Sequence, residues 1–166
     1  MTATGSDAPV HFEPTDPGSD IARALLEAYA REVATRCGMA GPWQRLATTD
    51  PDHYGAPGGC FLLVRIDGAA VGCGGLRTIG PGVLEVKRMY VAREGRGRGV
   101  GAGLLRALIE RATAMGAHRL VLDTRPELVE ATALYEAAGF RRVPSYNDNA
   151  DAGLWFELAL DGAAPG

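Results

Sequence analysis

The sequence predicts a mixed α/β fold, and three observations lead to this prediction. Apolar runs of strand length between residues 60 and 91 are separated only by short turn signals. Two later stretches have apolar residues at helical spacing, and each is followed by a strand-like run. The chain has 166 residues, of which 46% are hydrophobic and 22% charged, which is enough for a packed core without disulfides or metal.

The first third of the chain predicts one short strand and two helices. A strand over 10–13 is ended by Pro14 and the turn residues after it. Ser19 or Asp20 can cap a helix that runs to about Arg36, with apolar residues at helical spacing. A short helix is expected over 43–47. The proline- and glycine-rich stretch 50–59 is expected to be a loop.

The middle of the chain predicts three strands joined by tight turns. The run 60–66 is apolar enough for a buried strand, and Asp67-Gly68 is a hairpin signal. A returning strand is expected over 70–76, and Gly80-Pro81-Gly82 is the second turn. A longer strand then covers 83–91.

The last third predicts a strand–helix–strand–helix unit and a closing strand pair. A helix after the glycine-rich stretch ends at Gly116, because glycine is favoured just beyond a helix C-terminus. A strand is expected over 119–124 and a helix from Pro126 to Gly139, since proline suits the first helical position. Two final strands are expected over 140–143 and 154–160, on either side of a polar loop.

Composition excludes several classes of protein. The formal net charge of −3 gives no basic surplus for a nucleic-acid partner. No apolar run approaches the ~20 residues that span a bilayer, and the first residues have neither the basic nor the apolar region of a signal peptide. We therefore expect no nucleic-acid or membrane partner. The expected organisation is one domain over 10–160 with flexible ends at 1–9 and 161–166.

The three cysteines point to a reducing compartment. Cys37, Cys60 and Cys73 are odd in number and show no metal-ligand spacing with each other or with histidine. Free thiols are typical of the cytosol, so we expect a cytoplasmic protein without a metal site.

The segment Arg96-Gly97-Arg98-Gly99-Val100-Gly101-Ala102 predicts an anion site. It joins the strand 83–91 to a helix, and the first amides of a helix have no intrahelical acceptor. The Gly-Lys-Ser/Thr end of a P-loop is absent, which excludes that motif. A dinucleotide fingerprint does fit Gly97, Gly99 and Ala102, with Asp123 in the place of a ribose-binding carboxylate, but too little chain follows for the parallel sheet it needs.

A third interpretation covers more of the chain. Arg96-x-x-Gly99-x-Gly101 resembles the acyl-CoA-binding signature of the GNAT acetyltransferases, and Ala131-Thr132-Ala133-Leu134-Tyr135 to Gly139-Phe140 resembles a second motif of that family. The two motifs have family-like separation over residues 60–143, and the C-terminal part is similar to small stand-alone bacterial members. The resemblance implies a mostly antiparallel sheet of six to seven strands, splayed at its middle strands and flanked by about four helices.

The resemblance also implies acetyl-CoA as co-substrate and an N-acetyltransferase reaction by direct attack in a ternary complex. The acceptor is expected to be a primary amine of a small molecule; a protein or peptide acceptor and a non-catalytic acyl-CoA sensor are the alternatives. A homodimer is a common assembly in this family. The residues implied in acetyl-CoA binding are Met89, Tyr90, Val91, Arg96, Gly97, Arg98, Gly99, Val100, Gly101, Ala102 and Tyr135.

Two residues are candidates for catalysis. Tyr135 carries a hydroxyl among leucines and alanines and is the expected general acid toward the CoA sulfur; a core tyrosine is the alternative. Glu85 is a carboxylate in an apolar strand and the expected base; an ion pair with Lys87 or Arg77 is the alternative. Leu128 stands where the family often has an asparagine that contacts CoA, so that contact is not expected here.

The acceptor-binding residues are expected on loops and in the central strands. Tyr54, Tyr146 and Asn147 are polar-aromatic loop residues, and Arg77 and Lys87 lie in predicted strands. Together with Arg88, these two cations would suit an acceptor that bears a carboxylate. Strict alternation would put Glu85, Lys87 and Met89 on one face of the strand, unless a bulge intervenes.

Overall fold

The computed structural model describes residues 8–49 and 51–160, and its core is a seven-stranded sheet. The strand order is β1-β2-β3-β4-β5-β7-β6, and every neighbouring pair is antiparallel except β4 and β5. The strands are β1 (Val10–Pro14), β2 (Gly59–Ile66), β3 (Ala69–Gly80), β4 (Val83–Val91), β5 (Arg119–Thr124), β6 (Arg141–Val143) and β7 (Leu154–Ala159). The predicted mixed α/β fold is confirmed.

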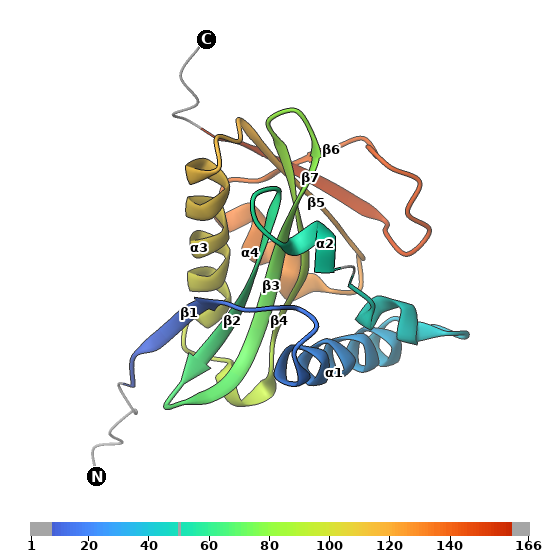
Figure 1. The fold of residues 1–166 in the computed structure, drawn as a ribbon. Coiled ribbons are helices and arrows are strands. Elements are labelled where there is room, and N and C mark those ends of the chain that lie inside the picture. The colour runs from blue at the N-terminus through green and yellow to red at the C-terminus, as the bar shows by residue number, and fades with distance from the viewer. Residues whose placement is uncertain (1–7, 50, 161–166) are drawn as a thin grey trace.

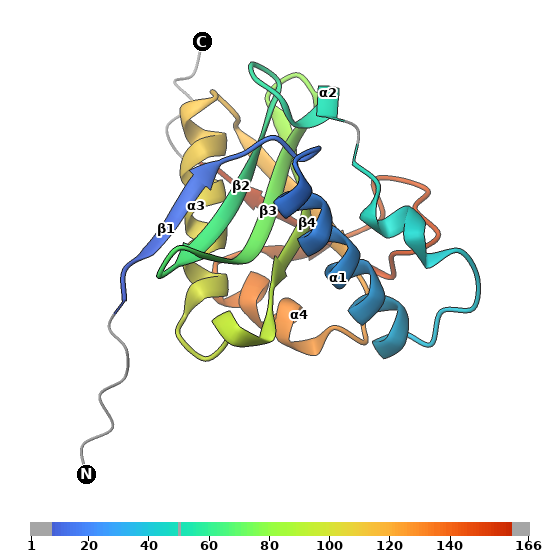
Figure 2. The same cartoon turned by 60° about the horizontal axis from the view of Figure 1, so that its bottom comes forward.

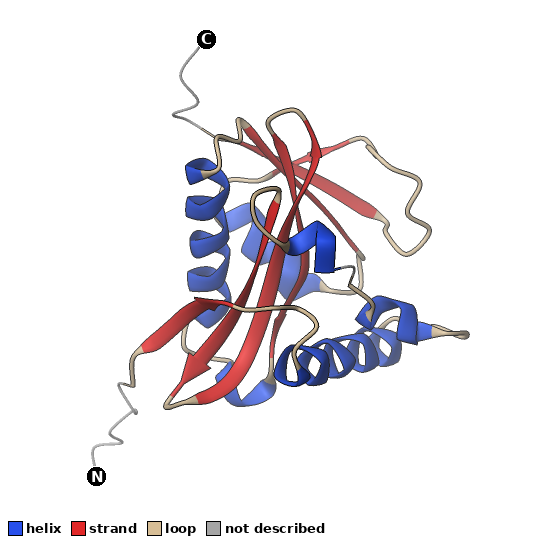
Figure 3. Ribbon diagram, in the orientation of Figure 1, coloured by secondary structure: helices blue, strands red, loops and turns tan. Residues whose placement is uncertain are grey.

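Helices cover both faces of the sheet (Figures 1 and 3). α1 crosses in front of the central strands in Figure 2, while α3 lies behind them. The helices are α1 (Asp20–Arg36), α2 (Pro51–Tyr54), α3 (Val100–Ala114) and α4 (Val129–Ala137), with 3₁₀ turns η1 (Trp43–Ala47) and η2 (Arg93–Gly95). Ser19 caps α1, as expected, by accepting a hydrogen bond from the Ala22 amide at 3.3 Å.

Two apolar layers hold these helices on the sheet. On one face, leucines of α3 pack with β2, β4 and β5 and with Tyr135, Phe140 and Phe156. On the other face, α1 packs through Leu25 and Leu26 against Phe61, Leu63, Cys73 and Tyr54. Since β2 and β3 contribute buried residues to both layers, they have long apolar runs with little alternation.

The sheet divides between β4 and β5. These parallel strands pair only over Val83–Glu85 and Arg119–Val121, and β4 then continues to Val91 without a partner on that side. The predicted splay at the middle strands is therefore present. It leaves one edge of β4 with unpaired amides and carbonyls, which are strong hydrogen-bonding groups.

A bulge interrupts β4 just beyond this division. Cys73 pairs with Tyr90 and Gly75 with Lys87, so that Gly74 alone lies opposite two residues, Arg88 and Met89. Arg88 has φ +58°, which costs a non-glycine residue about 1–2 kcal/mol. The alternation expected for an unbroken strand is thus wrong beyond Lys87: Met89 packs in the layer of α3, and Tyr90 packs in the layer of α1.

Three predicted boundaries were also wrong. The expected loop 50–59 contains the one-turn helix α2, which begins at Pro51. β3 runs on to Gly80, because Arg77 and Thr78 pair with Glu85 and Leu84 of β4. α4 begins at Val129 rather than Pro126, since the Leu128 amide donates to the Arg125 carbonyl in a preceding turn.

The structure describes only part of the predicted domain and of its predicted flexible ends. Residues 1–7 and 161–166 of the expected flexible ends lie outside the described residues. The single domain over 10–160 stays a prediction.

Candidate active site

A groove of about 460 Å³ lies beside the unpaired edge of β4 and is called the donor groove below. One wall is the end of β4 with the glycine-rich loop and the start of α3, and the other walls are α1 and α4. Of the residues implied in acetyl-CoA binding, nine line this groove: Met89, Tyr90, Val91, Arg96, Gly97, Gly99, Val100, Gly101 and Ala102. Arg98 is exposed and does not line it.

The glycine-rich loop presents bare backbone to the donor groove. Gly97 and Gly99 have φ of +82° and +69°, and a Cβ at either position would meet no atom within 4 Å. Gly99 is the N-cap of α3, and no side chain caps that helix. The first amides of α3 are therefore available to an anion, with the helix dipole favouring negative charge.

Arg96 is already engaged by α1. Its guanidinium donates to both carboxylate oxygens of Glu32 at 2.7 and 2.8 Å and lies over the Tyr90 ring. The Glu32 hydrogen bond raises the pKa of Arg96. A second pair, Arg36 with Glu130 at 2.6 Å, links α1 to α4 across the same groove.

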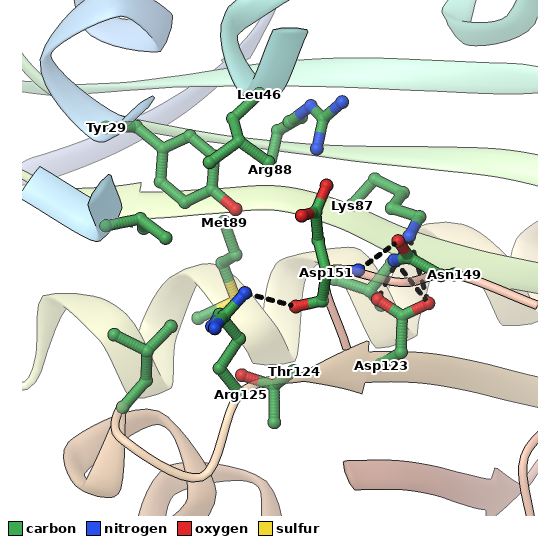
Figure 4. A pocket seen from close by; sticks show the side chains of 13 residues that line it. Tyr29, Leu46, Lys87, Arg88, Met89, Asp123, Thr124, Arg125, Asn149 and Asp151 are labelled. Carbon is green, nitrogen blue, oxygen red and sulfur yellow. Dashed lines mark hydrogen bonds and ion pairs between the residues drawn. The ribbon is translucent and has the colours of Figure 1, made fainter. Parts of the chain in front are cut away.

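A small inner pocket, of about 60 Å³, adjoins the donor groove between β4 and β5 (Figure 4). Four residues line both spaces: Tyr29, Val33, Met89 and Leu128. Tyr29 comes from α1, and its hydroxyl is directed into the inner pocket in Figure 4. The pKa of Tyr29 is raised by burial, and the nearby Arg88 guanidinium opposes that rise.

An outer cavity of about 390 Å³ lies on the far side of the inner pocket. The two share Leu46, Lys87, Arg88, Asn149 and Asp151. Four of the five residues expected to bind the acceptor line the outer cavity: Tyr54, Arg77, Lys87 and Asn147. Tyr54 belongs to α2 rather than a loop, and its ring packs on Phe61 with only 5% of the residue exposed.

Glu85 is a buried carboxylate with 1% of the residue exposed, and it belongs to a network of polar side chains between the strands. Its Oε1 accepts from Arg77 at 2.8 Å, and its Oε2 accepts from the Tyr146 hydroxyl at 2.5 Å. Lys87 Nζ is 3.8 Å from Oε2. Burial raises the pKa of Tyr146, and the hydrogen bond to Glu85 raises it further. The ion pairs of Glu85 with Arg77 and with Lys87, both considered from the sequence, are thus present. The Tyr146 hydroxyl is a third partner of Glu85.

Asp123 is the second buried carboxylate of the network. Its oxygens accept from Lys87 at 3.1 and 3.2 Å and from the amides of Asn147 and Asn149 at 2.8 and 3.2 Å. Burial alone would raise the pKa of Asp123, but Lys87 and the two amides outweigh it and lower that pKa. Asn147 is fixed in turn by the Trp155 indole, which donates to its Oδ1 at 2.9 Å.

Tyr135 lies in α4 and is 7% exposed. Its ring contacts Phe140 and Phe156, each at 6.0 Å between centroids. Burial raises the pKa of Tyr135, and Tyr29 and Asp123 contribute to the rise. The hydroxyl therefore stays protonated at neutral pH, and Tyr135 packs in the apolar core without lining the donor groove.

Sequence reasoning missed Tyr29 and Asp151. Tyr29 looked like one of several apolar positions of α1, and only the crossing of that helix over the β4 bulge brings its hydroxyl into the site. Asp151 is held by Arg45 at 2.6 Å, across 106 residues of sequence. No local pattern signals either contact.

The described residues show neither a metal-binding cluster nor a membrane-spanning helix. No group of three or more His, Cys, Asp and Glu side chains within 8–49 and 51–160 could hold a metal ion. In the same ranges, no helix has the length and apolar character to cross a membrane. The cysteines found there are free thiols.

The fold and the site define a class of protein. A glycine loop at a helix N-terminus and a strand with a free edge adjoin a polar pocket at the division of the sheet. The model of the acetyltransferase (GNAT) family matches residues 22–140. The chain therefore belongs to the acetyltransferase (GNAT) family and is an N-acetyltransferase of its acyl-CoA-dependent class, as the sequence motifs indicated.

Individual relatives agree with this assignment. The chain is 38% identical over 132 residues to an uncharacterized N-acetyltransferase of Schizosaccharomyces pombe, covering 78% of this chain and 80% of that protein. It is 33% identical over 132 residues to human N-acetylaspartate synthetase, covering 79% of this chain but only 44% of that protein. A GNAT family acetyltransferase from Elizabethkingia anophelis, solved with acetyl-CoA bound, has the same fold, with a TM-score of 0.65 and 22% identity over 91% of this chain and 98% of that chain.

Proposed function

We propose that the protein transfers an acetyl group from acetyl-CoA to the primary amine of a small molecule, by direct attack in a ternary complex. One observation carries the proposal: the donor groove and the inner pocket meet at four shared residues, beside the bulge of β4. A thioester in the groove and an amine in the pocket would come together there, as direct transfer requires.

The residues of the donor groove fit acetyl-CoA in three respects. The uncapped start of α3 suits a pyrophosphate, and the open positions at Gly97 and Gly99 leave room for it. The free edge of β4 offers amides and carbonyls to the amide groups of a pantetheine arm, in the manner of an added strand. The relative from Elizabethkingia anophelis was solved with this ligand.

The reaction needs a proton donor and a proton acceptor. The amine nitrogen attacks the acetyl carbonyl, the C–S bond breaks, and the sulfur takes a proton as it leaves. Tyr135 is the proposed donor because burial keeps its hydroxyl protonated. Glu85 is the proposed acceptor. Since Arg77 and Tyr146 occupy its oxygens, the amine proton reaches it through the Tyr146 hydroxyl or a water.

A small acceptor is supported by the size and polarity of the space. The inner pocket holds only about 60 Å³, and the outer cavity beside it is lined largely by polar and charged side chains. The name of the human relative, N-acetylaspartate synthetase, denotes a small N-acetylated product. A cytoplasmic location and a homodimer are part of this proposal.

The test is incubation with acetyl-CoA and a panel of small amines, following release of free thiol. The expected result is thiol release and an acetylated amine by mass spectrometry. Binding of acetyl-CoA without turnover on any amine would favour an acyl-CoA sensor. Turnover on peptides alone would favour the protein acetyltransferase.

A further inference from the structure

The inner pocket and the outer cavity contain four arginine and lysine side chains besides Arg88, and each is paired. Arg77 is held by Glu85, Lys87 by Asp123, and Arg45 by Asp151. Arg125 donates to the Asp151 carbonyl at 3.1 Å and lies 3.6 Å from Glu127. These positive charges are compensated within the chain.

Arg88 differs from these four residues. Its Nη2 donates to the Thr48 carbonyl at 3.2 Å, and its buried Nε, like that of Arg125, has no hydrogen-bond partner. No carboxylate within 8–49 and 51–160 forms an ion pair with it. A guanidinium has five N–H donors in a planar fork that matches a carboxylate, so most of its donors are available to a ligand.

The backbone of Arg88 shows that its position is specified by the fold. It is one of two non-glycine residues with positive φ in the described chain, and it forms the bulge opposite Gly74. The bulge turns the side chains of Lys87 and Arg88 into the same cavities. Strained residues persist where the surrounding structure requires them, and they concentrate at functional sites.

Arg88 also occupies the right place between the two spaces. It lines both the inner pocket and the outer cavity, and the next residue, Met89, lines both the inner pocket and the donor groove. A ligand group at Arg88 would therefore lie at the mouth of the inner pocket, a short distance from an amine placed beside Met89. The Tyr29 hydroxyl points into the same space (Figure 4).

We propose that Arg88 binds a carboxylate of the acceptor, so that the acceptor is a small amino acid whose carboxylate lies a few bonds from the reacting amine. This inference rests on the proposed function and names the substrate class of the same site. A lysine side chain, and a peptide N-terminus that is not Asp or Glu, carries no carboxylate within a few bonds of its amine, so the proposal also separates small acceptors from most protein ones.

The experiment compares matched acceptors that differ only in the carboxylate. Glycine, L-alanine and β-alanine are each assayed against their carboxamides, following thiol release. We expect kcat/KM to be higher for at least one acid than for its amide. The amine of the amide is less basic, so more of it is unprotonated at neutral pH. This difference alone would make the amide the better acceptor.

Arg88→Gln should remove this preference, lowering kcat/KM for the acid about 30-fold through KM and leaving the amide unchanged. Arg88→Asn is the second variant, since asparagine tolerates the left-handed backbone and should fold if Arg88→Gln does not. Arg65→Gln is the control: it removes an arginine that is paired with Glu13 and lines neither the inner pocket nor the outer cavity, so the preference should remain.

Calorimetry of the same acids and amides, in the presence of CoA, separates the proposed acetyl transfer from the proposed carboxylate site at Arg88. If no amine is acetylated but an acid binds and Arg88→Gln abolishes that binding, the proposed function fails and the carboxylate site stands. Equal use and equal binding of acids and amides by the wild type would overturn the site. An equal loss for both ligand types in the Arg88 variants would assign Arg88 to structure.

Discussion

The donor groove and the outer cavity are built in different ways. One wall of the groove depends on backbone, with glycines and a helix terminus that come from adjacent stretches of sequence, Met89–Val91 and Arg96–Ala102, while α1 and α4 supply the other walls. The outer cavity depends on side chains that η1, α2, β3, β4 and the loop after β6 bring together. A backbone site needs few residue identities, whereas a side-chain site changes with each substitution.

Substitution of Tyr135, which lines neither region, has the largest expected effect. Tyr135→Phe keeps the ring between Phe140 and Phe156 and removes only the hydroxyl. If the hydroxyl protonates the leaving sulfur, kcat should fall by about 10²–10⁴-fold, with the dissociation constant of acetyl-CoA unchanged. Steady-state kinetics and calorimetry measure the two quantities. Equal losses in both would make Tyr135 a binding or packing residue.

Asp123 tests the side-chain region. Asp123→Asn leaves the buried Lys87 without its main partner, so the free energy of unfolding at pH 7 should fall by about 3 kcal/mol, while acetyl-CoA affinity stays the same. The folded-state pKa of Asp123 is lowered. Its stabilisation is therefore present above its ordinary pKa of about 3.9 and is lost as the pH falls below that value.

Urea unfolding of the wild type and the variant between pH 7 and pH 3 measures this difference. It should be largest at neutral pH and shrink below about pH 4. A constant difference over the whole range would show that the ionised carboxylate is not what stabilises the fold.

Gly99 tests the backbone region, and Gly116 provides its control. Both have positive φ, +69° and +85°, and a Cβ at either would meet no atom within 4 Å. Gly99→Val and Gly116→Val should therefore lose similar stability, since valine is strained there. Only Gly99→Val should lose acetyl-CoA affinity, by about 100-fold, because its side chain would stand between the amides and a phosphate. If the two variants bind acetyl-CoA with similar affinity, the amides at the start of α3 do not bind its phosphates.

Arg96 and Glu32 give the smallest expected effect. Glu32 occupies the Arg96 guanidinium at the donor groove, so it competes with a ligand phosphate. Arg96→Gln should weaken acetyl-CoA binding about 5-fold, and Glu32→Gln should strengthen it by a similar factor, with both effects reduced in high salt. Titrations at low and high ionic strength check this. Weakening by both substitutions would mean that the pair itself shapes the groove.

Features that depend on adjacent residues could be predicted from the sequence, whereas contacts between distant segments could not. The succession of strands along the chain, the hairpins and the glycine-rich turn before α3 follow from local patterns, and the structure agrees with them. The β4 bulge does not, because a one-residue insertion leaves no mark on a run such as Val83–Val91. The partners of Glu85 were half predictable: Arg77 and Lys87 are strand neighbours, while Tyr146 is 61 residues away. Contacts of that kind depend on where the loop after β6 folds back.

The four residues shared by the donor groove and the inner pocket have a consequence for inhibition. Because the two spaces adjoin at Met89 and three other shared residues, we expect a single compound to occupy both if a short bridge joins a CoA-like part to an amino-acid part. Once one part is bound, the other is held at an effective concentration of about millimolar or more. Such a bivalent compound should therefore bind more tightly than either part alone, and its best bridge length would measure the passage between the two spaces.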